Sequence, residues 1–304
     1  ALGIFNFGNA VLSANGDTKR PLLYLTIAGI LNVILNLFFV IVCKMAADGV
    51  ALASVISQYV SAILVVWHMM RLNDACKFYF QRLRFHGDEV GRILGLGVPA
   101  GIQHMIFAIA NLFIQAAVNS FDSTMVSGNA AAANTDTIIY NIMMAFYTAC
   151  STFMGQNWGA GHKKRMMDSY LISLFYAFAV AAVLGVAFYF AGRPFLYVFT
   201  NSADVVEAGM QRMKIMCVSY AISAFMDNTI AACRGLGRTI VPTVVVIMGS
   251  CVFRVIWVYT IFAHYHTIPS LYLLYAFSWT ITAAAEIVYF LHCFRKLRLV
   301  PETA

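Results

Sequence analysis

Residues 169–192 read SYLISLFYAFAVAAVLGVAFYFAG, an apolar run without a single Asp, Glu, Lys or Arg. A helix needs about 20 such residues to cross the hydrocarbon core of a bilayer. Residues 22–43, 49–70 and 93–121 form similar uncharged runs. Hydrophobic residues make up 61% of the chain and charged residues only 11%, which excludes an ordinary water-soluble domain of this size. The sequence therefore predicts a protein that crosses a membrane several times.

These spans should be helical, because lipid offers no water to satisfy open backbone groups. The runs are also too continuously apolar for the alternating strands of a β-barrel. We therefore expect an all-α, polytopic membrane helical bundle with about nine spans. The expected spans cover residues 1–14 (in part), 21–43, 49–70, 93–118, 130–155, 169–192, 211–233, 242–263 and 270–294. The first is too short for a full crossing, so we expect the natural chain to begin further upstream.

The net charge of +7 follows the two sides of the predicted membrane and does not indicate nucleic acid. If each apolar run is one crossing, most of the 20 lysines and arginines fall on one set of span ends. The opposite set holds only Lys44, Arg193, Arg212 and Lys214, and Arg254 lies inside a span. By the positive-inside rule the basic side is cytoplasmic. This predicts a multi-pass protein of the plasma membrane, the inner membrane in a bacterium, with a cytoplasmic C-terminus.

The longest polar connection, residues 71–92, divides the chain and carries several positive charges. We expect residues 1–70 and 93–304 to form two transmembrane lobes, the second with six spans and a cytoplasmic tail, joined by residues 71–92 as a cytoplasmic linker. Gly, Thr and Pro at positions 16, 18 and 21 recur with the same spacing at positions 237, 239 and 242. Duplicated halves of this kind are common in transporters, which bind substrate and coupling ions between or within the halves.

Four motifs carry a family resemblance. They are GVPAGIQ at residues 97–103 followed by Asn111, TFMGQNWGAG at 152–161, CRGLG at 233–237 with Thr239 and Pro242, and Arg254 with Trp257. Their order and spacing resemble the multidrug and toxic compound extrusion (MATE) family. The resemblance implies a two-lobe transporter fold of twelve helices. It also implies that the chain begins in the fourth helix, so that residues 1–70 hold helices four to six and residues 93–304 the whole second lobe.

Two aspartates inside spans are the main candidates for function. A charge there costs about 2.5–3.5 kcal/mol on insertion scales and usually marks a cavity, a partner or a function. Asp136 has Tyr140 one turn away on the same face, and the two could hold a proton, a sodium ion or a cationic amine. Alternatively, Asp136 lies near the outer end of its span and meets water. Asp227 is better centred, and Tyr220 and Ser223 share its helical face.

Arg254 is the one cation placed well inside a span, and Trp257 follows it by one turn. A purely structural ion pair between Asp227 and Arg254 would neutralise two costly charges. We weigh this pair equally with a switch, in which Asp227 exchanges Arg254 for a proton or a cation during transport.

Polar side chains also follow the first span of the rear lobe. His104, Asn111 and Gln115 lie within a narrow sector of the helical wheel. Interhelical hydrogen bonding is the favoured interpretation for such residues over substrate contact. Gln103 precedes them and belongs to the GVPAGIQ motif, which makes it the stronger candidate for the transport pathway.

In the front lobe, Asn32 and Asn36 lie one turn apart and are expected to face Ser54 on the next span. Many members of the resembling family carry an aspartate where Asn36 stands, and a further acidic residue on a first helix that this chain lacks. The resemblance therefore moves the expected coupling site to Asp136 and Asp227 in the rear lobe.

The function implied by the resemblance is secondary active efflux of amphipathic cationic compounds, driven by an H⁺ or Na⁺ gradient through alternating access. Asp136 and Asp227 would couple the ion, with Tyr140, Tyr220 and Gln103 lining the site. We expect no enzyme activity, cofactor, metal site or nucleic-acid partner, and a monomer surrounded by membrane lipid. One alternative is a lipid-linked saccharide flippase of the same superfamily, which would need several basic residues in the central cavity, where the sequence indicates only Arg254. Another is a non-transporting membrane domain.

Overall fold

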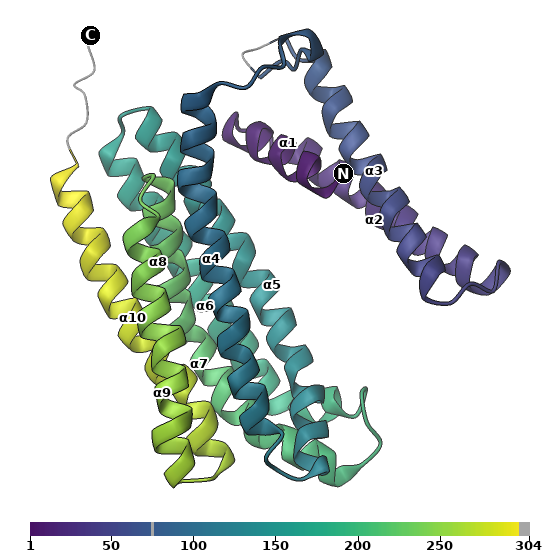
Figure 1. The fold of residues 1–304 in the computed structure, drawn as a ribbon, viewed down its shortest axis with the longest axis vertical. Helices are drawn as coiled ribbons and strands as arrows, with labels where there is room; N and C mark the ends of the chain where they lie inside the picture. Colours follow the sequence, from purple (N-terminus) through teal and green to yellow (C-terminus); the bar gives the residue numbers. More distant parts are fainter. Residues whose placement is uncertain (74–75, 298–304) are drawn as a thin grey trace. The chain divides into compact units, whose positions relative to one another are not determined.

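The computed structural model describes residues 1–73 and 76–297. These residues are built from helices and connecting turns, and eight of the helices are long and apolar enough to cross a membrane. The all-α, polytopic membrane fold is therefore confirmed. The chain divides into two compact units, Ala1–His86 and Gly87–Ala304, coloured purple to blue and blue to yellow in Figure 1. Of the tail predicted after residue 294, residues 298–304 lie outside the described residues.

The first unit is a small helical hairpin with a third helix packed on it. It comprises α1 (Leu2–Ala14), α2 (Lys19–Leu37) with its π-helical continuation η1 (Phe38–Val42), and α3 (Ala47–Arg71). The last of these packs against both α1 and α2. A short 3₁₀ turn, η2 (Phe80–Arg82), follows before the second unit.

The second unit begins with α4 (Gly87–Val118), which includes residues 87–92 of the expected linker. Asp88 and Glu89 lie in its first turn, where the helix dipole favours negative charge. Arg92 forms an ion pair with Glu89 at 3.2 Å. This polar turn extends the helix without burying apolar surface, so hydrophobicity alone did not reveal it.

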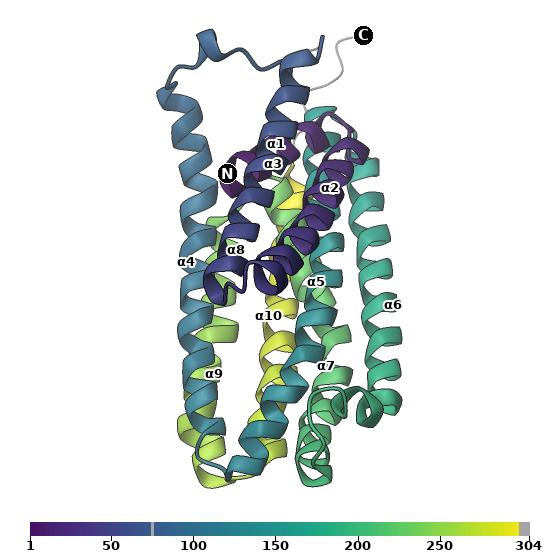
Figure 2. The ribbon, with the colours of Figure 1, turned by 90° about the vertical axis from the view of Figure 1, so that its right-hand side faces the viewer.

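The remaining elements of this unit are α5 (Ser123–Gly159), α6 (Lys163–Leu196), α7 (Ala203–Gly235), the span α8 (Ile240–Val246), η3 (Ile247–Val252), α9 (Phe253–Trp257) and η4 (Val258–Phe262), and α10 (Ile268–Lys296). Helix α7 is the centre of the bundle, because it packs against α5, α6 and α10. The apolar window of α7 is 67% buried, whereas that of α4 is 11% buried. Figure 2 shows α4, α5 and α6 running along the bundle.

Glycines bring α7 close to its neighbours. A Cβ on Gly128 of α5 would lie 2.6 Å from the backbone nitrogen of Gly209 of α7. On the other side, a Cβ on Gly185 of α6 would lie 2.2 Å from the carbonyl oxygen of Cys217. Such close backbone approach is how helices associate where no hydrophobic effect drives them together. The central position of α7 therefore depends on small residues of α5 and α6.

Left-handed glycines close the turns at which the sequence repeats. Gly16 and Gly237 have φ angles of 89° and 69°, and Gly161 between α5 and α6 has 75°. Only glycine adopts these angles without steric cost. In each turn the next N–H reaches back five residues at 2.9 Å, as in a Schellman motif: Asp17 to Leu12, His162 to Asn157 and Arg238 to Cys233. The repeated glycines thus form the same helix end in both units.

Pro99 joins two of the sequence motifs. It lies inside α4 and has no N–H, so the carbonyl of Gly95 lacks its usual helical partner. Thr239, at the start of α8, donates to that carbonyl at 3.3 Å. One turn further along α4, Gln103 accepts from Thr243 of α8 at 3.3 Å. The GVPAGIQ segment is thereby bonded to the beginning of α8.

Candidate functional site

An open cavity of about 670 Å³ lies within the second unit, lined by residues of α4, α5, α7, α9 and α10. Small-molecule sites typically measure about 300–1,000 Å³. The wall is largely apolar and aromatic, and the ionic side chains in its lining are Asp136, Asp227, Arg212 and Arg254. The two aspartates predicted from the sequence therefore share one cavity with two arginines.

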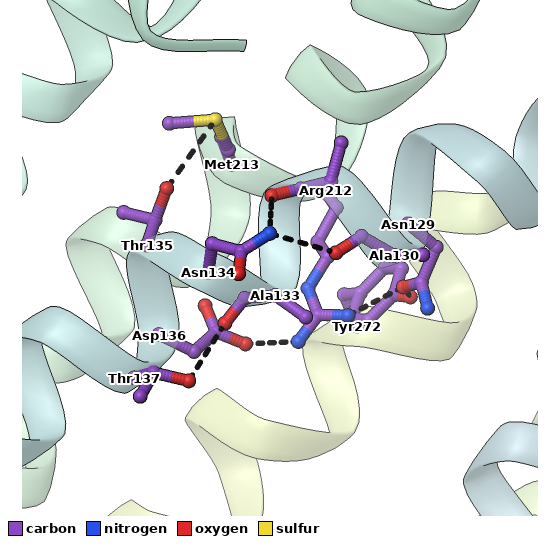
Figure 3. A network of polar contacts seen from close by, with 11 residues as sticks. Asn129, Ala130, Ala133, Asn134, Thr135, Asp136, Thr137, Arg212, Met213 and Tyr272 are labelled. Carbon is purple, nitrogen blue, oxygen red and sulfur yellow. Dashed lines mark hydrogen bonds and ion pairs between the residues drawn. The ribbon is translucent and has the colours of Figure 1, made fainter. Parts of the chain in front are cut away.

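Asp136 of α5 is paired with Arg212 of α7 (Figure 3). The same guanidinium donates to Oδ1 of Asn129, which also accepts from the hydroxyl of Tyr272 on α10. Arg212 lies over the Tyr272 ring, 5.0 Å from its centroid. The side chains of Arg212 and Asp136 are only 11% and 23% exposed. Asp136 is therefore neutralised inside a network that ties three helices together.

The position of Arg212 corrects two expectations. Arg212 was expected among the charges at the outer span ends, but α7 begins at Ala203, so Arg212 lies more than two turns inside this helix with its side chain largely buried. It also makes Arg254 one of two arginines in the cavity lining, not the only one. The signal that could have found Arg212 is Asp136 itself, since a buried carboxylate needs a cation.

Asp227 of α7 lines the same cavity, but unlike Asp136 it is not paired with an arginine in the described part of the chain. Over residues 1–73 and 76–297, its carboxylate accepts no hydrogen bond and forms no salt bridge. The cations that act on it electrostatically are Arg234 and Arg254. Tyr220 and Ser223 line the cavity on the same helix. The predicted polar face of α7 thus lines the cavity, but Asp227 and Arg254 do not form an ion pair in this structure.

Arg254 is held by rings instead of a carboxylate. Only 2% of it is exposed, and its Nε donates to Ser278 of α10 at 3.2 Å. The guanidinium carbon lies 4.4 Å from the ring centroid of Tyr275, 5.4 Å from that of Phe107 and 5.8 Å from that of Trp279. Cation–π attraction is worth about 2 kcal/mol or more where the cation is desolvated. This aromatic cage accounts for a buried cation without an ion pair.

The cavity lining also includes the other predicted residues of α4 and α5. They are Gln103, His104, Asn111, Gln115 and Tyr140. Gln103 is 7% exposed and accepts from Arg234 at 3.0 Å as well as from Thr243. Gln115 donates to Asn119 at 2.9 Å in its own helix. Gln103 thus connects the cavity to α7 and α8, while Gln115 is bonded within α4.

Trp257 supports the fold next to the cavity and is absent from the described lining. Its indole Nε1 donates to the carbonyl of Ser270 at 2.8 Å, and its ring stacks on Phe277 at 5.3 Å. Ser270 is part of the capping box that begins α10 with Thr267. Trp257 therefore fixes the start of α10.

Asn32 and Asn36 lie in the first unit. Asn32 donates to Ser57 of α3 at 3.2 Å, and Asn36 donates to Asn32 at 3.0 Å. Ser54, the expected neighbour, instead donates to the carbonyl of Val50 in its own helix. The polar face of α2 thus meets α3 one turn further along than expected, at Ser57.

Membrane-spanning helices packed around a cavity with charged and aromatic walls are the architecture typical of membrane transporters. The sequence pattern of the MatE family matches residues 99–260. The chain belongs to that family, the multidrug and toxic compound extrusion transporters, and is accordingly a multi-pass membrane protein.

Curated relatives carry related names. The Probable multidrug resistance protein YpnP of Bacillus subtilis is 30% identical over 216 residues, which cover 71% of this chain and 48% of the relative. The FAD transporter of Shewanella oneidensis is 25% identical over 209 residues, covering 66% and 45%. The chain thus spans about half the length of these relatives.

Solved structures share the fold. A multidrug resistance MATE family transporter in an outward-facing conformation matches with a TM-score of 0.87 and 19% identity. A MOP superfamily transporter from Pyrococcus furiosus, described as having a binding pocket of reverse polarity, matches with a TM-score of 0.88 and 18% identity. Each match covers 96% of this chain and 66% of the other. At this identity the likeness establishes the fold alone.

Proposed function

We propose that the protein exports amphipathic organic cations in exchange for H⁺ or Na⁺ by alternating access. The observation that carries this proposal is the carboxylate of Asp227, which lines an aromatic cavity without a salt bridge in the described part of the chain. A group that binds either the substrate or the coupling ion, but not both, links the two fluxes. Relatives named for multidrug resistance, in Bacillus subtilis and Thermotoga maritima, support the same substrate class.

The two aspartates have different roles in this mechanism. Asp227 is the first group to bind a cation, because no arginine has to leave it. Asp136 already has Arg212 as an internal counter-ion, so an incoming cation has to compete with that guanidinium. Tyr140 and Tyr220 line the same cavity and offer aromatic faces to the apolar part of the substrate.

We propose an inner-membrane location with the C-terminus in the cytoplasm. In the second unit, the α5–α6 turn, the α7–α8 turn and the end of α10 lie at one end of the bundle (Figure 1). That end carries Lys163, Lys164, Arg165, Arg238, Arg295 and Lys296. At the opposite end, Arg193 is paired with Glu207 at 2.8 Å. The positive-inside rule makes the basic end cytoplasmic.

Efflux of a cationic aromatic dye from cells expressing the gene tests the proposal. We expect Asp227→Asn to weaken dye binding to the purified protein at least tenfold, which is about 1.4 kcal/mol, and to abolish efflux. Asp204→Asn is the matched control, because Asp204 is an exposed carboxylate in the first turn of the same helix. Collapsing the proton and sodium gradients separately identifies the coupling ion.

Efflux that survives in Asp227→Asn at the level of Asp204→Asn contradicts the carboxylate mechanism. Loss of efflux in the control as well would mean that the substitutions act on folding, which the melting temperature of each purified variant separates from binding. Absence of efflux in the wild type under every gradient would favour a non-transporting membrane domain.

A flavin nucleotide is a second candidate substrate, because Arg212 and Arg254 both line the cavity. Arginines beside aromatic rings suit an anionic aromatic ligand, and one relative is named as an FAD transporter. Competition between FAD and the cationic dye for the purified protein distinguishes the two. FAD that displaces the dye from the wild type, but not from Arg254→Gln, would favour the flavin. The saccharide flippase is not proposed, since the relatives reported above are named for drug resistance and FAD transport.

A further inference from the structure

Glu286 of α10 is a carboxylate that neither the cavity nor the efflux mechanism uses. It is 0% exposed, and among residues 1–73 and 76–297 neither of its carboxylate oxygens has a hydrogen-bond partner. It is not part of the cavity lining. An ionised carboxylate that is buried without hydrogen bonds is strongly disfavoured, whereas the protonated acid is neutral and avoids most of that cost.

The surroundings of Glu286 are closed on both sides along α10. One turn before it, the hydroxyl of Thr282 lies 3.0 Å from that of Ser250 on η3. One turn after it, the Phe290 ring packs on Tyr170, with centroids 4.6 Å apart. Both Thr282 and Phe290 are 0% exposed. Glu286 therefore lies in a buried interface that α10 forms with its neighbours.

Arg234 of α7 is the cation that acts electrostatically on Glu286. Helix α8, which also packs on α10, has no ionisable side chain among residues Ile240–Val246. The other ionisable groups on the elements around Glu286 include Asp227 and Cys233 on α7, Tyr170 on α6, Cys251 on η3, Arg254 on α9, and Tyr289 and Cys293 on α10 itself. Arg254 is already enclosed by its rings and Ser278, which leaves Arg234 as the available counter-ion.

Arg234 is bonded on its cavity side in this structure. Its guanidinium donates to the hydroxyl of Tyr147 on α5 and, at 3.0 Å, to Oε1 of Gln103 on α4. Its Nε is buried and has no hydrogen-bond partner within the part of the chain that the structure describes. The guanidinium is therefore bonded to the neutral oxygens of α4 and α5, and two carboxyl groups, those of Asp227 and Glu286, act on it electrostatically without an ion pair in the described part of the chain.

We propose that Glu286 is a proton-binding site separate from the cavity, and that its protonation decides which partner Arg234 takes. With the proton bound, Glu286 is neutral and Arg234 remains on Gln103 and Tyr147, holding α7 to α4 and α5. When the proton leaves, the carboxylate attracts Arg234 and these two bonds are released. The proton is transferred from the carboxyl oxygen to water when the interface opens.

A proton suits this site better than a sodium ion. Hard cations require several oxygen ligands, and the hydroxyl of Thr282 next to Glu286 is already bonded to Ser278 and Ser250. The other nearby side chains include the thiol of Cys233, which is a soft ligand. Carbonyl groups of α10 at this depth are used by the helix itself.

Infrared difference spectroscopy of the purified whole chain in lipid tests the proton site. The wild type is expected to show the carbonyl stretching band of a protonated, buried carboxylic acid at neutral pH. In Glu286→Gln a component of this band is lost, whereas Asp204→Asn retains the full intensity. Glutamine has the shape of the neutral acid, so the variant should fold. An unchanged band in Glu286→Gln, or no such band in the wild type, overturns the proton site.

The effect on Arg234 has its own readout. Spin labels at Leu96→Cys on α4 and Phe175→Cys on α6, in a background without other accessible cysteines, report the position of α4. The distance between them is expected to change as the pH rises in the wild type and to stay at its low-pH value in Glu286→Gln. A variant that follows the wild type at every pH overturns the role of Arg234. Neither measurement requires transport, so the result is independent of the efflux proposal.

Discussion

Asp136 and Asp227 line one cavity, yet their surroundings differ. Asp136 is paired with Arg212, and Asn129 and Tyr272 complete the network around that guanidinium. Arg254 and Arg234 act on Asp227 only electrostatically, because Arg254 is enclosed by rings and Arg234 is bonded to α4 and α5. Two carboxylates of equal charge thus acquire different functions from what their nearest arginines already hold.

The number of charged residues in a cavity therefore does not tell how many of them are available to a ligand. Arg212 and Asp136 cancel each other, and Arg254 is stabilised without using Asp227. A mutation at an arginine should therefore reveal whether that arginine serves a carboxylate or a ring. Three substitutions separate these cases.

Arg212→Gln breaks the ion pair with Asp136 and should have the largest effect on stability. It leaves Asp136 buried without a counter-ion, so the free energy of unfolding should fall by about 3–5 kcal/mol. Thermal unfolding of the purified protein measures this. The double variant with Asp136→Asn should recover most of the loss, because it removes the uncompensated charge. A single variant that melts like the wild type would mean that the pair carries no stability.

Arg254→Lys tests the aromatic cage around Arg254, which has no carboxylate partner in the described part of the chain. Lysine keeps the charge but loses the planar contact with Tyr275 and the bond to Ser278, so we expect a loss of about 1–2 kcal/mol. The matched control is Arg193→Lys, at an ion pair whose side chains are 63% and 50% exposed, where the change should stay within about 0.5 kcal/mol. Equal melting temperatures for the two variants would contradict the aromatic cage.

Tyr272→Phe should have the smallest effect. It removes the hydroxyl that donates to Asn129 but keeps the ring beneath Arg212, so the expected loss is about 1 kcal/mol. Tyr275→Phe is the comparison, because in the described part of the chain the Tyr275 hydroxyl has no hydrogen-bond partner. If both variants lose the same stability, the hydrogen bond from Tyr272 to Asn129 does not stabilise the network around Arg212 and Asp136.

The fold was largely predictable because lipid imposes a single rule. Long apolar runs have to become helices, and the Gly, Thr and Pro repeat marked two helix ends that the structure forms in the same way. Span ends were less predictable, since polar turns such as residues 87–92 continue a helix without any apolar signal.

The sequence predicted the carboxylates of the candidate site, Asp136 and Asp227, better than its arginines. Arg212 and Arg234 were counted with the charges at span ends, yet both guanidinium groups bond to partners inside the bundle, because long side chains can reach inward. Their placement depends on tertiary partners that a helical wheel cannot supply. Glu286 was also missed, although it lies in the middle of the expected span 270–294, where a carboxylate calls for an explanation.

The turns at the two ends of the second unit differ in how much change they can tolerate. At the basic end, the short connections 160–162 and 236–239 are closed around Gly161 and Gly237. At the other end, side-chain caps from Asp122 and Thr267 begin α5 and α10, and residues 197–202 and 263–267 form the longer connections. An epitope tag or a fused reporter should therefore be accepted in residues 197–202 or 263–267 and rejected at the glycines. The side of the membrane that is easiest to label is thus set by turn geometry.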